Sequence, residues 1–245
     1  MVLLHENERL DHLPNERLRI IQAKDILAFS MDAVLLAQFV HVPIQKGKII
    51  DLCSGNGVIP LLLSERTKGT ITGVEIHPRL VDMAKRNIML NGLEGRIEMY
   101  EADINDLPES LLKETFDVVT CNPPYFPLTK DTKKNIHEHL YIARHEVYCT
   151  LEDCLRVSSR LVRQRGKVAF VHRPERIVEI CLLMKKYRIE PKRMQLVYPK
   201  KEKEANMLLI EGIKDGQPGL KCLPPLVVYD EKNEYTKQFC EVFFR

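Results

Sequence analysis

Short apolar runs rich in β-branched residues alternate with helical patterns through the middle of the chain. The runs that predict buried strands are residues 48–53, 70–75, 96–100, 116–121 and 167–171. The patterns between them that predict helices are residues 58–66, 78–91, 151–163 and 174–187. Such alternation is typical of a parallel sheet whose strands are joined by crossover helices. We therefore expect an α/β fold of the Rossmann-like kind.

Two later runs, near residues 193–198 and 206–211, flank the charged loop 199–205. They predict an antiparallel hairpin at the edge of the sheet, which makes a mostly parallel sheet of seven strands.

Gly166 is expected to end the helix that begins at Leu151.

Before the sheet, residues 18–22 predict a short strand and Ser30 is a candidate N-cap for a helix over residues 31–40. The 245 residues are enough for one sizeable core with small additions. We predict three parts, listed in chain order: an N-terminal strand and helix extension packing on the core (1–45), the core domain (46–215) and a C-terminal tail (216–245).

The composition favours an intracellular globular protein. No apolar run approaches the ~20 residues that span a bilayer, and the first residues do not resemble a signal peptide. The seven cysteines are scattered and form no CxxC pair. We expect reduced thiols in the cytoplasm, with neither a disulfide framework nor a structural zinc site.

Charge is distributed unevenly along the chain. The net charge is +3, but residues 130–203 hold 19 Lys and Arg against nine Asp and Glu, so the rest of the chain is net acidic. A basic segment of this size suits a polyanionic partner such as RNA, although solvated helix faces would give the same count.

A glycine-containing turn follows the first predicted strand. The run Asp51-Leu52-Cys53-Ser54-Gly55-Asn56-Gly57 lies between that strand and a helix, where open α/β sheets bind ligands. The third glycine of a dinucleotide fingerprint is missing, since Pro60 stands there. A carboxylate suits a cationic ligand better than a phosphate. S-adenosyl-L-methionine (SAM), which carries a sulfonium and an ammonium group, is therefore the expected cofactor, and a simple tight turn is the alternative.

Two further carboxylates follow the next strands. Glu75 ends the second strand and could accept both hydroxyls of a ribose. Asp103 follows the third strand, where it could accept from the amino group of an adenine ring. Each alone would more often be a surface carboxylate, but three at successive strand ends favour a ligand site.

The run Asn122-Pro123-Pro124-Tyr125 follows the fourth strand. The lone pair of an aryl or amide NH2 group is delocalised, which makes it a poor nucleophile. Acceptors on both N–H bonds, the Asn122 side-chain oxygen and the Pro123 carbonyl, would localise that lone pair and gain strength as positive charge develops. Prolines hold the acceptors rigidly. Tyr125 offers a stacking face for a base, and on that view its hydroxyl matters little.

These motifs together resemble the amino-methyltransferases that carry NPPY, and within them the bacterial tRNA1(Val) adenine-N6 methyltransferase family. The resemblance covers about residues 15–215 and includes the run Phe29-Ser30-Met31-Asp32-Ala33-Val34-Leu35-Leu36. It implies a class I methyltransferase fold and a tRNA substrate. It also implies that Asp51, Gly55, Gly57, Glu75 and Asp103 bind SAM, and that Asn122, Pro123, Pro124 and Tyr125 grip the target. Cys53-Ser54 and Asn56 depart from the usual glycine turn.

Other chemistry is weighed against this. His137, His139, His145 and Cys149 lie close in sequence, but the family resemblance implies no metal, so we expect none. The competing functions are a protein glutamine N-methyltransferase, which uses the same grip, and a non-catalytic RNA-binding protein on a methyltransferase scaffold. Neither a membrane partner nor a particular oligomeric state is indicated.

Overall fold

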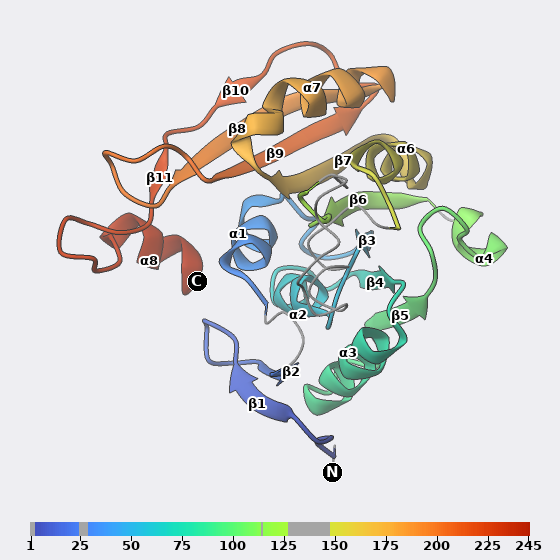
Figure 1. Ribbon diagram of the computed structural model, residues 1–245. Coiled ribbons are helices and arrows are strands. Elements are labelled where there is room, and N and C mark those ends of the chain that lie inside the picture. Colours follow the sequence, from blue (N-terminus) through green and yellow to red (C-terminus); the bar gives the residue numbers. More distant parts are fainter. Residues whose placement is uncertain (1–2, 25–28, 114, 127–147) are drawn as a thin grey trace, which may run out of the picture.

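The central sheet contains the strands that the sequence predicts. The computed structural model describes residues 3–24, 29–113, 115–126 and 148–245. Within them the sheet has the strand order β10-β8-β9-β7-β6-β3-β4-β5, and β11 also pairs with β8 (Figure 1). The strands are β3 (Lys48–Leu52), β4 (Thr70–Glu75), β5 (Ile97–Glu101), β6 (Phe116–Cys121), β7 (Val162–His172), β8 (Ile189–Tyr198), β9 (Met207–Lys214), β10 (Lys221–Cys222) and β11 (Leu226–Val227).

Strands β3, β4, β5, β6 and β7 are parallel to one another, and β9 runs antiparallel to both β7 and β8. The prediction of a mostly parallel seven-stranded sheet with a closing hairpin is confirmed. Two short strands, β10 and β11, extend it beyond β8. Because β9 is antiparallel to both of its neighbours, β8 points the same way as β7, and the hairpin turn 199–206 lies at the carboxyl end of the sheet.

The order of the strands changes direction beside β3. The chain passes from β3 through β4 to β5 on one side and then returns to place β6 on the other side of β3. Open α/β sheets bind their ligands at such a switch point, outside the carboxyl ends of the strands. The fold therefore places the candidate site at the ends of β3 and β6.

Helices cover both faces of the sheet (Figure 1). Ile49 and Ile50 are adjacent in β3 but pack into different hydrophobic clusters, because successive side chains of a strand point to opposite faces. The helices of the first cluster are α1 (Met31–Phe39), α2 (Val58–Ser64), α3 (Pro78–Leu90) and α8 (Lys237–Phe243). Those of the second are α4 (Glu109–Leu112), α6 (Leu151–Leu161) and α7 (Ile177–Lys186), the last preceded by the 3-10 turn η1 (Pro174–Arg176).

The role predicted for Gly166 is wrong. Helix α6 ends at Leu161, and Gly166 lies inside β7. Val162 already pairs with Phe116 of β6, and the register then shifts before the regular pairing resumes. A Cβ on Gly166 would lie 2.5 Å from Val162 Cγ2 and 3.0 Å from the Asp117 carbonyl oxygen. The glycine is needed for close packing at this irregularity rather than as a helix stop.

The caps of the two helices that flank the site differ from expectation. Ser30 precedes α1, but its side chain makes no capping hydrogen bond. Thr150 caps α6 instead, in a capping box with Asp153: the Thr150 hydroxyl accepts from the Asp153 amide, and the Asp153 carboxylate accepts from the Thr150 amide.

The N-terminal segment forms a hairpin of β1 (Glu8–His12) and β2 (Arg19–Ala23), of which the sequence predicts only the second strand. Arg86 of α3 holds it through a bidentate ion pair with Glu8, with both N···O distances 2.7 Å. Asn87 Oδ1 accepts from the Ile21 amide at 2.6 Å, and Asn87 Nδ2 donates to the Asn56 carbonyl at 3.0 Å. The hairpin is thereby joined to the glycine turn.

Residues after 216 have more structure than the sequence suggests. They add β10 and β11 to the sheet edge and end in α8, which packs against α1. Phe239 is fully buried in the first cluster, and its ring contacts those of Tyr235 and Phe243. Across the described ranges no helix is both long and apolar enough to cross a membrane.

Candidate active site

The predicted site residues gather at one edge of the sheet. Asp51 lies in β3, Glu75 ends β4, Asp103 follows β5 and Asn122 follows β6. These four strands are parallel neighbours whose registers align their carboxyl ends. The fold therefore brings to one edge of the sheet side chains that are separated by up to 71 positions in the sequence.

Asp51 is completely buried. Its Oδ1 atom accepts a hydrogen bond from the Thr120 hydroxyl at 2.6 Å, whereas Oδ2 has no partner of normal geometry among the described residues. Burial raises the pKa of this carboxyl from 3.8 to about 7, although the Thr120 hydrogen bond acts in the opposite direction. A buried oxygen without a partner is costly, and a cationic ligand group would satisfy it.

The glycine turn has the backbone that its sequence requires. Gly55 and Gly57 have φ angles of 56° and 84°, in the left-handed region that favours glycine. A Cβ on Gly57 would lie 3.2 Å from Ala84 Cβ, so this glycine also allows the turn to approach α3. A Cβ on Gly55 would meet no atom of the described residues within 4 Å, so none of them blocks a ligand from approaching the turn.

Glu75 braces the turn. Its Oε2 atom accepts from the Gly55 amide at 2.9 Å and its Oε1 atom accepts from the His77 amide at 3.0 Å. Burial raises the pKa of this carboxyl. A carboxylate offers about four lone-pair sites, so Glu75 can still accept from a ligand hydroxyl.

Asp103 lies at the same edge of the sheet, in a turn that backbone atoms connect to the end of β4. Its carboxylate accepts from the Asn105 amide at 2.8 Å and so fixes the turn that follows β5. The Ala102 amide donates to the Glu75 carbonyl at 3.0 Å, which ties that turn to the end of β4. Asp103 is partly exposed, as an adenine-binding carboxylate has to be.

The Asn122-Pro123-Pro124-Tyr125 run leaves β6 with Pro123 buried and the other three residues partly exposed. Tyr125 folds back over this run. Its phenol oxygen lies 2.6 Å from Asp32 Oδ2 and 2.7 Å from Asn122 Oδ1. Tyr125 thus joins the run to α1, an element that precedes the predicted core domain.

The Tyr125 ring packs against His172, the last residue of β7, with ring centroids 5.0 Å apart and planes inclined by 50°. Burial lowers the pKa of His172 to about 4, so its imidazole is neutral at physiological pH. Burial and the neighbouring Asp32 raise the pKa of the phenol well above its usual range. Tyr125 therefore remains a hydrogen-bond donor.

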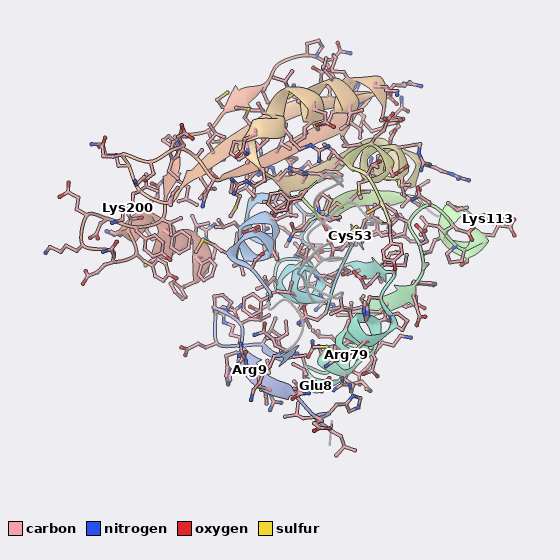
Figure 2. All side chains as sticks on the ribbon, in the orientation of Figure 1. Glu8, Arg9, Cys53, Arg79, Lys113 and Lys200 are labelled. Atoms are coloured by element: carbon pink, nitrogen blue, oxygen red, sulfur yellow. The ribbon has the colours of Figure 1, made fainter. Side chains whose placement is uncertain are left out.

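The basic segment is only partly described. Lys130, Lys133, Lys134 and Arg144, like His137, His139 and His145, lie outside the described residues. The hairpin turn that carries Lys200, Lys201 and Lys203 is at the carboxyl end of the sheet, on the same side as Asn122, and Lys200 lies at the periphery of the molecule (Figure 2).

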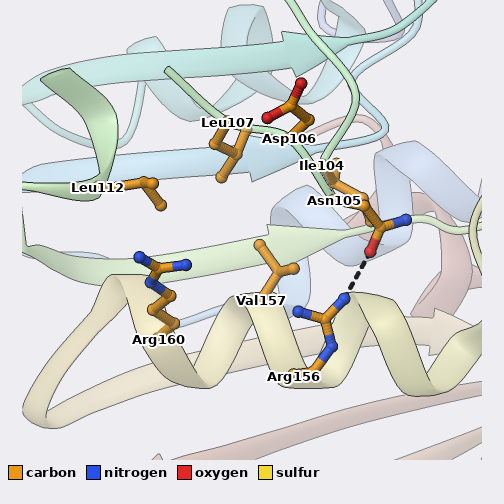
Figure 3. Close-up of a pocket in the computed structure, with 8 residues that line it drawn as sticks. All are labelled: Ile104, Asn105, Asp106, Leu107, Leu112, Arg156, Val157 and Arg160. Atoms are coloured by element: carbon orange, nitrogen blue, oxygen red, sulfur yellow. Dashed lines mark hydrogen bonds between the residues drawn. The ribbon is translucent and has the colours of Figure 1, made fainter. Parts of the chain in front are cut away.

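A separate hollow lies beside this edge of the sheet (Figure 3). Its wall runs from Ile104 to Leu107 and continues along α6, where the guanidinium groups of Arg156 and Arg160 lie. Arg156 donates to the Asn105 side chain at 2.5 Å and to Asp153 at 2.9 Å. The hollow contains none of the residues predicted for the cofactor or the target, so the candidate site is at the strand ends.

Three residues at the site have no role predicted from sequence. Thr120 holds Asp51, Asp32 holds Tyr125, and His172 supports the Tyr125 ring. Asp32 stands in the run Ser30-Met31-Asp32-Ala33, which carries part of the family resemblance and could have marked it. Thr120 and His172 carry no sequence signal, because only the pairing of β6 with its neighbours shows what they face.

Comparison with known proteins agrees with this geometry. Residues 45–211 match the protein family described as "Methyltransferase domain". A Mannheimia succiniciproducens protein named tRNA1(Val) (adenine(37)-N6)-methyltransferase is 28% identical over 218 residues, covering 85% of this chain and 82% of that protein. A Haemophilus influenzae protein of the same name is 28% identical over 224 residues, covering 86% of this chain and 87% of that protein.

Solved structures share the fold. An Agrobacterium tumefaciens protein described as a predicted O-methyltransferase superposes with a TM-score of 0.69 at 23% identity, covering 87% of this chain and 95% of that one. A Streptomyces coelicolor geranyl diphosphate C-methyltransferase, crystallised with S-adenosyl-L-homocysteine, superposes with a TM-score of 0.55 at 12% identity, covering 73% and 79% of the two chains. The expected class I fold is confirmed.

Proposed function

Because this chain belongs to the methyltransferase-domain family that its residues 45–211 match, we propose that it methylates N6 of an adenine in tRNA, at a position like adenine 37 of tRNA1(Val). It is a SAM-dependent N-methyltransferase. One observation supports the amine substrate above the others: Asn122, Pro123 and Tyr125 emerge at the switch point, directly beside the glycine turn. Relatives that match over most of their length carry the adenine-N6 name.

The site fits the cofactor. Asp51 presents a buried, unpartnered carboxylate oxygen that suits the ammonium group of SAM. Glu75 can accept from a ribose hydroxyl, and Asp103 is placed to accept from the adenine amino group. None of the described residues blocks the ligand from the backbone at Gly55. When bound, SAM supplies an electrophilic methyl group on its sulfonium.

The target amine is held by acceptors of this chain. One phenolic proton cannot serve both Asp32 and Asn122, and the carboxylate is the stronger acceptor. We infer that the Asn122 amide group donates through Nδ2 to the Tyr125 oxygen, an orientation that occupies nearly the same volume. Its Oδ1 atom is then free to accept from the target N–H, and the Pro123 carbonyl accepts from the other.

This arrangement makes the amine a better nucleophile without a strong base. Acceptors on both N–H bonds favour a pyramidal nitrogen and strengthen as that nitrogen becomes positive. The ammonium-like product is acidic enough to lose its proton to water. The neutral His172 imidazole and the protonated Tyr125 phenol therefore position groups rather than abstract the proton.

The turn with Lys200, Lys201 and Lys203 contributes to RNA binding at the rim. A base must leave its stack to reach Asn122, at a cost of a few kcal/mol, and phosphate contacts offset that cost. A tRNA substrate would place the enzyme in the cytoplasm.

The function is tested by incubating the protein with methyl-labelled SAM and separate pools of tRNA, ribosomal RNA, DNA and protein. Label should enter tRNA and be recovered as N6-methyladenosine. An Asn122→Ala variant should transfer none, and Asn233→Ala, in a distant turn, should transfer as the parent does. Label in glutamine residues of the protein pool would instead identify a protein methyltransferase, and the absence of label in every pool would indicate a non-catalytic scaffold.

A further inference from the structure

Three of the seven cysteines meet behind the glycine turn, and a fourth lies near them. Cys53 follows β3, Cys121 ends β6, Cys149 precedes α6 and Cys154 lies within α6. The Sγ atoms of Cys53 and Cys149 are 3.9 Å apart, and those of Cys149 and Cys154 are 3.8 Å apart. All three Sγ atoms lie within 4.8 Å of one another. Cys53 lies near the centre of the molecule (Figure 2).

Cys121 lies near this group but outside the trio whose Sγ atoms are all within 4.8 Å of one another. Its strand position pairs with Leu52, the neighbour of Cys53. Three thiols, from the glycine turn and from both sides of the start of α6, therefore meet at one point, although the sequence contains no CxxC pair.

The separations fit one ion better than one disulfide. Sulfur ligands lie about 2.3 Å from a tetrahedral zinc ion, which puts neighbouring sulfurs about 3.8 Å apart. A disulfide joins only two sulfurs at about 2.05 Å and would leave the third thiol of this group unused. Two of the three Sγ–Sγ distances in the group are close to the tetrahedral value.

The surroundings favour ligands over nucleophiles. Cys121 and Cys154 are fully buried, and Cys53 and Cys149 are partly buried against the same apolar cluster. A bound metal ion would stabilise these thiols as thiolates.

We propose that Cys53, Cys149 and Cys154 bind a thiolate-preferring divalent metal ion such as zinc. Each ligating thiol releases its proton to solvent as the ion binds, and no oxidation is involved. The ion takes no part in methyl transfer. It joins the glycine turn to helix α6, in contrast to the sequence-based expectation of no metal.

Metal analysis of the untagged, full-length protein tests this proposal. After zinc loading and gel filtration, elemental mass spectrometry should find about one zinc ion per chain. Cys149→Ser and Cys154→Ser should each lose most of it. Cys181→Ser, a partly buried cysteine of α7 outside the cluster, should retain it and serves as the matched control.

Cobalt titration of the parent protein gives a readout that does not depend on a variant folding. Co²⁺ bound by the cluster should produce the intense visible bands of tetrahedral thiolate coordination together with a thiolate charge-transfer band, and zinc should abolish both. Zinc content equal in the parent and Cys149→Ser, or a cobalt spectrum without thiolate bands, would overturn the proposal. So would a native mass lower by two hydrogens that maps to a disulfide within the cluster.

Discussion

The phenol of Tyr125 and the carboxylate of Asp32 lie 2.6 Å apart, although 93 residues separate them in the sequence. This contact connects α1 to the Asn122-Pro123-Pro124-Tyr125 run. The same phenol oxygen lies 2.7 Å from the Asn122 side chain, so Asp32 is linked to Asn122 through Tyr125.

We expect Tyr125→Phe and Asp32→Asn to lower kcat by about 10- to 100-fold, with little change in SAM affinity. The loss of a hydrogen bond to a charged group, about 1.5–3 kcal/mol, would leave Asn122 misplaced. The sequence alone predicts only a mild effect of Tyr125→Phe, because the stacking face survives in this variant. The contact with Asp32 and Asn122 predicts the larger loss of kcat. Single-turnover kinetics checks it, with exposed Asp106→Asn as control. Wild-type turnover in both variants would show that the contact does not position Asn122.

Asn122→Ala should abolish methyl transfer and leave SAM binding nearly intact. Its acceptor acts on the target nitrogen and gains strength only as charge develops there. Calorimetry and product formation measure the two quantities separately. Retention of more than a tenth of the parent rate, less than about 1.4 kcal/mol of barrier, would contradict the proposed grip.

SAM affinity should rise with pH up to about 7. The free protein protonates Asp51 below its pKa of about 7, and a bound ammonium group favours the ionised form. Binding below pH 7 therefore releases a proton, and the affinity should increase by at most about tenfold per pH unit. Above about pH 8 it should fall as the SAM amino group loses its own proton.

Two variants test whether Asp51 is the group whose titration changes SAM affinity. Asp51→Asn should remove the acidic limb of the profile, which is the rise of SAM affinity with pH below about pH 7. Thr120→Val removes the hydrogen bond that lowers the Asp51 pKa, so the limb should move to higher pH, while Thr72→Val in β4 should leave it in place. An unchanged limb in Asp51→Asn would assign the titration to another group.

Replacing Lys200, Lys201 and Lys203 with Ala should weaken tRNA binding and make its salt dependence shallower. For every phosphate that the variant no longer neutralises, the slope of log K against log salt concentration should decrease by about 0.7–0.9. Lys46 and Lys68, exposed near the amino ends of the strands, provide the control pair. A slope equal to that of the parent would exclude the hairpin turn from the RNA surface.

The strands could be predicted because their patterns are local. Residues 70–75 and 116–121 form β4 and β6 with the predicted bounds, since each is a short apolar run between turn residues. The role of Gly166 could not be predicted, because it depends on the close approach of the Asp117 carbonyl oxygen of the neighbouring strand β6. The tail could not be predicted for a similar reason: β10 and β11 have two residues each and exist only as partners of β8.

The residues of the candidate site also divide into those that the sequence could predict and those that it could not. Asp51, Glu75 and Asn122 could be proposed because they follow strands whose order the sequence implies. The cysteine cluster could not, since Cys53, Cys149 and Cys154 meet only after β3 and α6 have packed. Asp32 needed the fold as well, because nothing in sequence spacing places α1 beside Tyr125.

The packing of α8 on α1 bears on how the enzyme matures during translation. Asp32 leaves the ribosome early, but Phe239, which buttresses its helix, is made more than 200 residues later. Contacts between such distant segments form late, because closing a long loop costs entropy before any contact rewards it. A nascent chain can therefore hold its complete glycine turn and NPPY run while its catalytic geometry is still unfinished. Activity would begin only once synthesis has passed α8.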